Sequence, residues 1–395
     1  MPLEFAMDHP APPEAALTGN VSGRPKTLAE AKLWMKAKVA ARAHPMIALP
    51  HDRADALIDA LEGLDPLNWT AVWRPVGDAA RIAAQAAEAE GRTADAERLY
   101  REASGLYFMG RFPSPTHVAE QECAVLERET YLAAARLWDR PIEPIVIPFA
   151  GHAGEGDRVV VYLRRPLGIP RPPVVLMWGG VDAWKKQVTA VSDALLAQGF
   201  ATIAMDNAGT GESPLRGTVD GERAFVAVLD WAAAQGDLTG ERCALLGRSF
   251  GGYWVTKLVH QIPDRIVCGV NWGGGAHFMF QRDWIEASRF PDSYLMDLVE
   301  TRMAMLGATD DQGYIDGFAR LSLVDQRLLD RPCAPLLLMN GKNDQQCPIA
   351  DIHLLSEHGS PKAVRLFPGG HMGNTQQTLP TIVTWIASHF VEALA

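Results

Sequence analysis

The spacing of apolar residues divides the chain into two parts that meet near Pro141. Before that point, apolar residues recur three or four positions apart, which is the spacing of one face of an α-helix. The clearest helical stretches span residues 79–90, 93–109 and 119–137. We therefore predict an all-helical domain over residues 27–140, preceded by a tail rich in Pro and Ala at residues 1–26.

After Pro141, short apolar runs replace the helical spacing. Runs with the length and composition of buried strands lie at residues 145–147, 158–163, 174–177, 200–205, 243–246, 266–271, 335–340 and 363–367. Helical stretches at 252–259, 350–358 and 376–395 alternate with the later runs. Such alternation is typical of a sheet flanked by helices, so we predict an α/β domain over residues 141–395 with a mostly parallel, eight-stranded sheet.

One pentapeptide in this second part carries candidate chemistry. Gly247-Arg248-Ser249-Phe250-Gly251 has the pattern G-x-S-x-G and stands between a predicted strand and a predicted helix. A strand, a sharp turn and a helix are the context in which this motif forms a nucleophile elbow. The turn is so tight that the residues flanking the serine must be small, and it lifts the hydroxyl out of the sheet. Ser249 is therefore the predicted nucleophile.

A serine hydroxyl becomes a good nucleophile only when a base accepts its proton. In this fold the partners follow in the order Ser, acidic residue, His, each on a loop after a later strand. Asp344 follows the run at 335–340, and His371 follows the run at 363–367 in a Gly-Gly loop. The order of these residues predicts a triad of Ser249, His371 and Asp344.

Alternatives to this assignment involve other acidic residues and histidines. Asp344 could be an ordinary turn residue, since Asn-Asp pairs favour turns. Acidic residues that lie near it without directly following a strand are Asp325, Asp330 and Asp351. His353 and His358 suggest a metal site, but five positions along a helix correspond to about 140° of rotation, so they do not share a face. We therefore predict no metal site.

Attack on an acyl group also requires N–H donors for the oxyanion that forms. The N–H of Phe250, directly after the nucleophile, is one candidate. The second is expected in the loop after residues 174–177, where either Gly180 or Val181 could supply it. A further loop at 206–213 has the form D-x-x-G-x-G-x-S, but it lacks the Lys-Ser/Thr ending of a phosphate-binding loop.

Charge and composition exclude several other classes of function. The net charge of −10, spread without long runs of one sign, argues against binding to nucleic acid or to an anionic membrane. The five cysteines stand singly, which suits a reducing compartment. The N-terminal residues lack a signal-peptide pattern, and no window reaches the ~18 apolar residues of a spanning helix. We therefore expect a cytoplasmic protein that requires no cofactor.

Taken together, these motifs resemble those of the α/β-hydrolases that carry an N-terminal helical cap. This group includes 2,6-dihydroxypseudooxynicotine hydrolase, the fungal polyketide-shortening hydrolases and relatives of the fermentation–respiration switch protein. The resemblance spans nearly the whole chain. Its marks are Trp69, Trp73, residues 96–107, 179–182, Lys185, 247–253, Asp344 and Gly370-His371. It implies the α/β-hydrolase fold and the same three catalytic residues, and Lys186 departs from it because an acidic residue often stands there.

Two classes of function fit these observations. The first is an enzyme in which Ser249 accepts an acyl group that water then removes, with cleavage of a ketone carbon–carbon bond placed slightly ahead of ester cleavage. An aromatic or polyketide-like small molecule is the expected substrate, and a carboxylesterase of broad specificity is the alternative. The second class is a non-catalytic, partner-binding protein on a hydrolase scaffold. The complete set of candidate residues favours the enzyme.

Aromatic and polar residues near the expected site are candidates for a substrate pocket. They are Trp184, Trp272, His277, Phe278 and Trp284. The expected partner is a small molecule, and a homodimer is compatible with the sequence.

Overall fold

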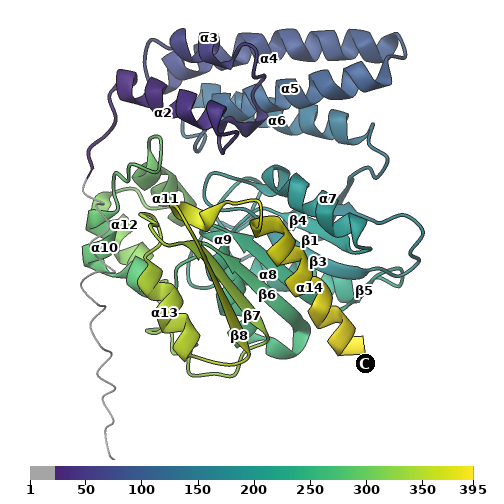
Figure 1. Ribbon diagram of the computed structural model, residues 1–395, viewed down its shortest axis with the longest axis vertical. Helices are drawn as coiled ribbons and strands as arrows, with labels where there is room; N and C mark the ends of the chain where they lie inside the picture. Colours follow the sequence, from purple (N-terminus) through teal and green to yellow (C-terminus); the bar gives the residue numbers. More distant parts are fainter. Residues whose placement is uncertain (1–22, 395) are drawn as a thin grey trace, which may run out of the picture.

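A layer of helices lies across an α/β domain in the computed structural model, which describes residues 23–394 (Figure 1). Most of the expected N-terminal tail, residues 1–22, lies outside the described residues. The change from helices to strands falls between Ala135 and Glu143.

The helical layer contains three long helices that pack side by side and shorter elements before them. The elements are α2 (Leu28–Ala40), η1 (Met46–Ala48), α3 (Ala54–Asp59), α4 (Pro66–Ala89), α5 (Thr93–Arg111) and α6 (Val118–Ala135). Asp65 caps the start of α4 by accepting the N–H of Asn68, and Pro66 occupies its first position, where no N–H is needed.

The helix α4 begins 13 residues before the stretch predicted at 79–90, because it continues through Pro75. A proline inside a helix removes one hydrogen bond and disfavours the helical conformation. Trp69 and Trp73, one turn apart, are fully buried, and the Trp69 indole N–H donates to the carbonyl of Met109 on α5. This packing outweighs the local preference of the proline.

The sheet has eight strands in the order β1-β2-β4-β3-β5-β6-β7-β8. The strands are β1 (Glu143–Pro148), β2 (Arg158–Arg164), β3 (Pro173–Trp178), β4 (Ala201–Met205), β5 (Thr239–Arg248), β6 (Ile266–Trp272), β7 (Leu336–Gly341) and β8 (Lys362–Phe367). Only the β1–β2 and β2–β4 pairs are antiparallel, and the other pairs are parallel. The predicted fold class, a mostly parallel eight-stranded sheet of the α/β-hydrolase type with a helical N-terminal region, is confirmed.

Helices cover both faces of the sheet (Figure 1). One face packs against α7 (Thr189–Ala197) and α14 (Thr378–Leu394), and the other against α8 (Glu222–Ala233), α9 (Gly251–Gln261) and α13 (Ile349–Glu357). A single-turn helix, η2 (Lys185–Val188), precedes α7, and η3 (Pro263–Arg265) precedes β6. The strands β3, β4, β6 and β7 and the second half of β5 are thereby enclosed, which explains their mostly apolar sequences.

An insertion of short helices lies between β6 and β7, and the sequence analysis did not predict these helices individually. It contains η4 (Phe278–Phe280), α10 (Arg282–Ala287), α11 (Leu298–Leu306) and α12 (Asp311–Ala319). It also carries Tyr294, whose ring lies 6.2 Å from that of Phe112 at the end of α5.

The helical layer and the α/β domain share one apolar core. A single cluster of buried residues includes Trp69, Trp73 and Phe112 from the helical layer together with Trp178 and Phe225 from the α/β domain. Polar contacts join them too, such as Tyr131 with Thr189 at 2.6 Å between their hydroxyl oxygens. Within residues 23–394, none of the helices combines the length and the apolarity that crossing a membrane requires.

Candidate active site

Ser249 sits in a strained turn between β5 and α9. Its φ is +52°, a left-handed conformation that is uncommon for a residue with a side chain. Its N–H donates to the carbonyl of Trp272 at 2.7 Å, which ties the turn to β6. A Cβ on Gly251 would lie 2.3 Å from the carbonyl oxygen of Gly179, so only glycine fits there. The sequence motif therefore forms the expected elbow.

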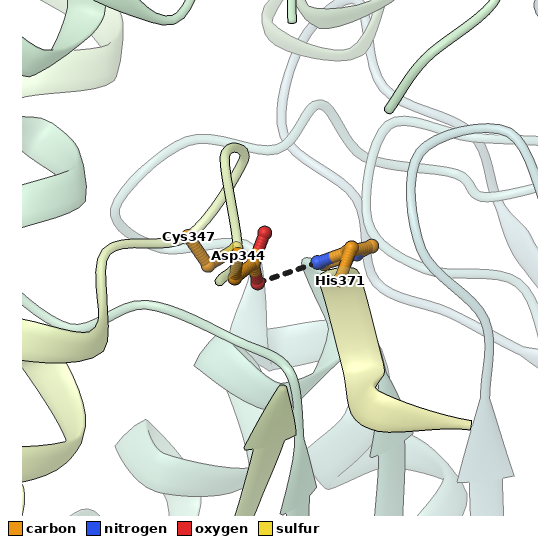
Figure 2. Close-up of side chains that lie close together, drawn as sticks. All are labelled: Asp344, Cys347 and His371. Carbon is orange, nitrogen blue, oxygen red and sulfur yellow. Dashed lines mark hydrogen bonds and ion pairs between the residues drawn. The ribbon is translucent and has the colours of Figure 1, made fainter. Parts of the chain in front are cut away.

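His371 joins this serine to an acidic residue from a third strand end. Ser249 Oγ lies 2.7 Å from His371 Nε2, and His371 Nδ1 lies 2.7 Å from Asp344 Oδ2. Asp344 follows β7, and His371 opens η5 (His371–Gly373) after β8. Figure 2 shows the imidazole and the carboxylate facing each other. The three residues singled out in the sequence thus form one continuous hydrogen-bonded chain.

The Asp344 carboxylate is fully buried but has its acceptor sites filled. Gln346 N–H donates to Oδ1 at 2.7 Å, and the Asn340 side-chain amide donates to Oδ2 at 2.8 Å. These donors fix the orientation in which the carboxylate faces the imidazole of His371. Asp344 is therefore built to hold a histidine that becomes positively charged.

Cys347 brings a third potential metal ligand close to Asp344 and His371 (Figure 2). The ligand atoms of the three residues lie within 4.8 Å of one another. However, burial raises the pKa of the Cys347 thiol well above its usual value, and the nearby Asp344 carboxylate acts in the same direction. A neutral thiol is a poor metal ligand, and both nitrogens of His371 already face Ser249 and Asp344. The site is thus better suited to proton transfer than to a metal.

The loop after β3 passes directly over the nucleophile. A Cβ on Gly180 would lie 2.8 Å from Ser249 Cβ and 3.1 Å from its Oγ, so glycine alone permits this approach. Within residues 23–394, the backbone N–H groups of Gly180, Val181 and Phe250 donate to no acceptor. All three are therefore available as donors for an oxyanion, and Gly180 and Val181 remain alternatives for the second one.

The end of this loop is held by the helical layer. Arg111, at the end of α5, donates to the carbonyl of Asp182 at 2.9 Å. His44 Nε2 lies 3.3 Å from Asp182 Oδ2. Although burial opposes ionisation, His44 and other neighbours lower the pKa of Asp182 to about 2. The loop that would stabilise the oxyanion is thus fixed from outside the α/β domain.

A buried cluster of charges lies behind Arg111. Glu127 on α6 accepts from Arg111 Nε at 2.8 Å, from Lys186 Nζ at 2.9 Å and from the Gln187 amide at 2.7 Å. Burial raises the pKa of Glu127, but the two cations outweigh it and leave the pKa below its usual value. Lys186, the departure from the family pattern, is therefore the partner of an acidic residue on the helical layer.

The loop at 206–213 is structural. Asp206 accepts from the backbone N–H of Lys185 and of Glu212, each at 2.8 Å, and pairs with the Lys185 ammonium. Burial raises the pKa of this carboxyl, but Lys185 outweighs it and holds the pKa below its usual value. The acidic residue of the D-x-x-G-x-G-x-S pattern therefore fixes the start of η2.

Two cavities meet at the candidate site. A small cavity of about 110 Å³ is lined by Ser249, His371, Gly180 and Val181, and by Trp34, His44, Phe112 and Tyr294 from outside the sheet. A large cavity of about 1060 Å³ lies between the helical layer and η2–α7. Residues that line both are Ala43, His44, Pro45, Arg248 and Asn374.

Of the five pocket residues expected from the sequence, Trp272 lines the large cavity. The Trp184 ring lies 3.6 Å from the guanidinium carbon of Arg111 and, like the other three, lines neither cavity among the described residues. His277 Nδ1 lies 2.7 Å from Ser322 Oγ, and the backbone N–H groups of His277 and Phe278 both donate to Asp351. The Trp284 indole donates to the carbonyl of Gln346. Trp184, His277, Phe278 and Trp284 therefore make contacts behind the residues that line the two cavities.

Two wall residues from the helical layer, His44 and Phe112, escaped the sequence-based reasoning. His44 and Phe112 lie more than a hundred positions before Ser249, in a part of the chain with no motif. They lie close to Ser249 only because α2, η1 and α5 pack on the α/β domain. No local pattern of residues signals such a contact.

Comparisons with known proteins identify the family and the fold of this chain. A family model described as "Esterase FrsA-like" matches residues 37–391. Esterase FrsA of Photobacterium profundum is 24% identical over 341 residues, which cover 84% of this chain and 79% of that protein. Esterase FrsA of Salmonella paratyphi B is 27% identical over 339 residues, with the same coverage.

Two solved structures share the fold across both parts of the chain. The structure of 2,6-dihydroxy-pseudo-oxynicotine hydrolase has a TM-score of 0.73 at 21% identity and covers 88% of this chain and 95% of its own. AbyA5 has a TM-score of 0.70 at 21% identity and covers 93% of this chain and all of its own. At such identities the likeness concerns the fold, including the helical layer.

Proposed function

Since this chain belongs to the FrsA-like esterase family and is a hydrolase, we propose that it hydrolyses an ester by way of Ser249, His371 and Asp344. The family resemblance expected from the sequence is confirmed. The observation that carries the proposal is the chain of two 2.7 Å contacts from Ser249 Oγ through the imidazole of His371 to Asp344.

The proposed reaction has two stages. In the first, His371 Nε2 accepts the hydroxyl proton while Ser249 Oγ attacks the carbonyl carbon, and the free N–H groups of the Gly180 loop and Phe250 stabilise the oxyanion. The leaving alkoxide then takes the proton from His371, which leaves an acyl group on Ser249. In the second, water attacks this acyl group and gives a proton to His371, which passes the proton to Ser249 Oγ as the acid is released. Asp344 stabilises the charged imidazole in both stages.

An aromatic or polyketide-like molecule is the proposed substrate class. Aromatic rings of Trp34, Phe112 and Tyr294 border the small cavity, and Phe108, Tyr131, Trp138 and Trp272 border the large one. Aromatic side chains are common in the walls of sites for small organic ligands, and both cavities combine them with charged and polar residues. Membership of an esterase family places ester cleavage ahead of ketone carbon–carbon cleavage, which reverses the order drawn from the sequence. A cytoplasmic location and a homodimer stay predictions from the sequence.

Reaction of the protein with a fluorophosphonate probe and turnover of aryl esters test this proposal. Ser249→Ala should abolish labelling and lower turnover by several orders of magnitude, while Ser388→Ala, on the exposed face of α14, should leave both unchanged. Ester turnover by Ser249→Ala at the wild-type rate would refute the assignment. A wild-type protein that neither reacts with the probe nor cleaves esters or matched aryl ketones would support the non-catalytic alternative.

A further inference from the structure

Arg248, the last residue of β5 and the direct neighbour of the nucleophile, lines both cavities. Its side chain has few partners in the protein. Nη1 donates to the carbonyl of Gln187 at 3.3 Å, and Nε is buried without any hydrogen-bond partner. Within residues 23–394, no carboxylate oxygen lies within ion-pair distance of its guanidinium. Arginine has five N–H donors, so most of its capacity stays unused.

The surroundings of Arg248 provide no direct ion pair for its positive charge among the described residues. Burial lowers its pKa, and Asp182 is the one carboxylate whose charge acts against this effect. Asp182, however, is already paired with His44 at 3.3 Å. The ring of Trp272 lies 5.4 Å from the guanidinium and offers only a weak cation–π contact. Arg248 is half-buried with a buried Nε and no direct counter-charge, so an anion that enters the cavity would be bound favourably.

Two other arginines at the large cavity, Arg98 and Arg101, differ in this respect. Arg98 is ion-paired with Asp95 and Glu102, and Arg101 is ion-paired with Glu97 on the same helix, α5. The lysine at this cavity, Lys186, is paired with Glu127. Two further cations at the cavities form no ion pair among the described residues, namely the exposed Arg42 at the large cavity and the half-buried Lys38 at the small one. Arg248 differs from both because it is the direct neighbour of Ser249 in the chain and lines both cavities.

We propose that Arg248 binds a carboxylate of the substrate, so that the enzyme prefers esters that carry a carboxylate near the scissile bond. This inference rests on the proposed esterase function. Consecutive residues of a chain are about 3.8 Å apart at their Cα atoms, so one small molecule can reach both Ser249 and Arg248. The planar fork of arginine matches the two oxygens of a carboxylate and can bind both. The neutral amide of the same shape would leave the guanidinium unpaired.

Matched esters of hydroxybenzoic acids test the charge preference. The measurement is kcat/KM for 3- and 4-acetoxybenzoate, divided by that for the corresponding acetoxybenzamides. The wild-type ratio should exceed that of Arg248→Met by about 10- to 100-fold, the range expected for a hydrogen bond to a charged group. Arg248→Lys should recover part of the preference. Arg101→Met, which removes an ion-paired arginine at the same cavity, should keep the ratio within about twofold of wild type. An equal ratio in wild type and Arg248→Met would overturn the proposal.

Binding to a protein without its nucleophile separates this inference from the proposed function. Calorimetry with Ser249→Ala should show that benzoate binds at least about tenfold more tightly than benzamide, and that adding Arg248→Met abolishes the difference. If this result is found while wild type cleaves no ester, the proposed function fails and the anion site stands. If benzoate and benzamide bind Ser249→Ala equally, the anion site fails whatever the turnover. Phenyl phosphate that binds more tightly than benzoate would overturn the assignment to a carboxylate.

Discussion

Glu127→Gln should destabilise the protein severely, although it only replaces one carboxylate oxygen by an amide nitrogen. Among the described residues, Glu127 is the one carboxylate in contact with Arg111 and Lys186, and the side chains of Glu127 and Arg111 are both fully buried. The amide keeps the shape of the acid, so no cavity forms and the loss is electrostatic. Two buried cations would be left without a counter-charge.

The expected magnitude follows from this loss of charge. Breaking a buried ion pair by removing one partner costs about 3–5 kcal/mol. A folded protein has a total stability of about 5–15 kcal/mol, so the change removes a large share of it. Urea unfolding at pH 7, followed by tryptophan fluorescence, measures the free energy of unfolding. Glu129→Gln, two residues away on the exposed side of α6, serves as the control and should change it by less than about 0.5 kcal/mol.

The direction of the pH dependence gives a second check. The pKa of Glu127 in the folded protein lies below its usual value, because Arg111 and Lys186 outweigh the effect of burial. A carboxyl of this kind contributes its stability at pH values above its unfolded pKa of about 4.3 and loses it as the pH falls through the folded pKa. The difference between wild type and Glu127→Gln should therefore be full at pH 7 and shrink below about pH 4.

Removal of one of the stranded cations should restore part of the stability. The double variant Glu127→Gln with Lys186→Met leaves one uncompensated buried charge in place of two, so it should be more stable than Glu127→Gln alone. A loss below about 1 kcal/mol in Glu127→Gln, or a double variant that is less stable still, would refute this account of the cluster.

Three further predictions concern the site and the core. Gly180→Ala should lower kcat/KM for aryl esters by about 100-fold or more, because its Cβ would lie 2.8 Å from Ser249 Cβ and displace an oxyanion donor; unchanged turnover would show that the loop moves freely. Asp344→Asn should lower kcat by about 10⁴-fold with binding of substrate retained, and a loss below tenfold would exclude it as the acid. Burial, together with Lys362, lowers the pKa of His260 to about 4, so stability should fall between about pH 6.5 and 4 as the unfolded chain takes up a proton. His260→Asn should flatten that part of the urea-unfolding profile, and an unchanged slope would contradict this assignment.

Local patterns were sufficient to predict the sheet and the three hydrogen-bonded residues. Each strand is a short apolar run, and Ser249, Asp344 and His371 follow three of these runs in the order that the fold requires. The start of α4 was missed because Pro75 locally favours a break, while the burial of Trp69 and Trp73 depends on helices that follow later in the chain. Pairings between distant residues leave no such local trace.

The contacts between the helical layer and the α/β domain explain why this layer is more than a cover over a pocket. Arg111 spans the two parts, since its Nε pairs with Glu127 on α6 while its Nη1 holds the carbonyl of Asp182 at 2.9 Å, two residues after Gly180. A donor group aids catalysis only when it is already in place as charge develops on the substrate. Fixing this loop from α5 supplies that rigidity, and the position of the loop thereby depends on the docking of the helical layer. Lys186 belongs to the same arrangement, because its ammonium group forms an ion pair with Glu127 between the α/β domain and the helical layer. The basic residue at position 186, where an acidic one often stands, is thus explained by its ion pair with Glu127.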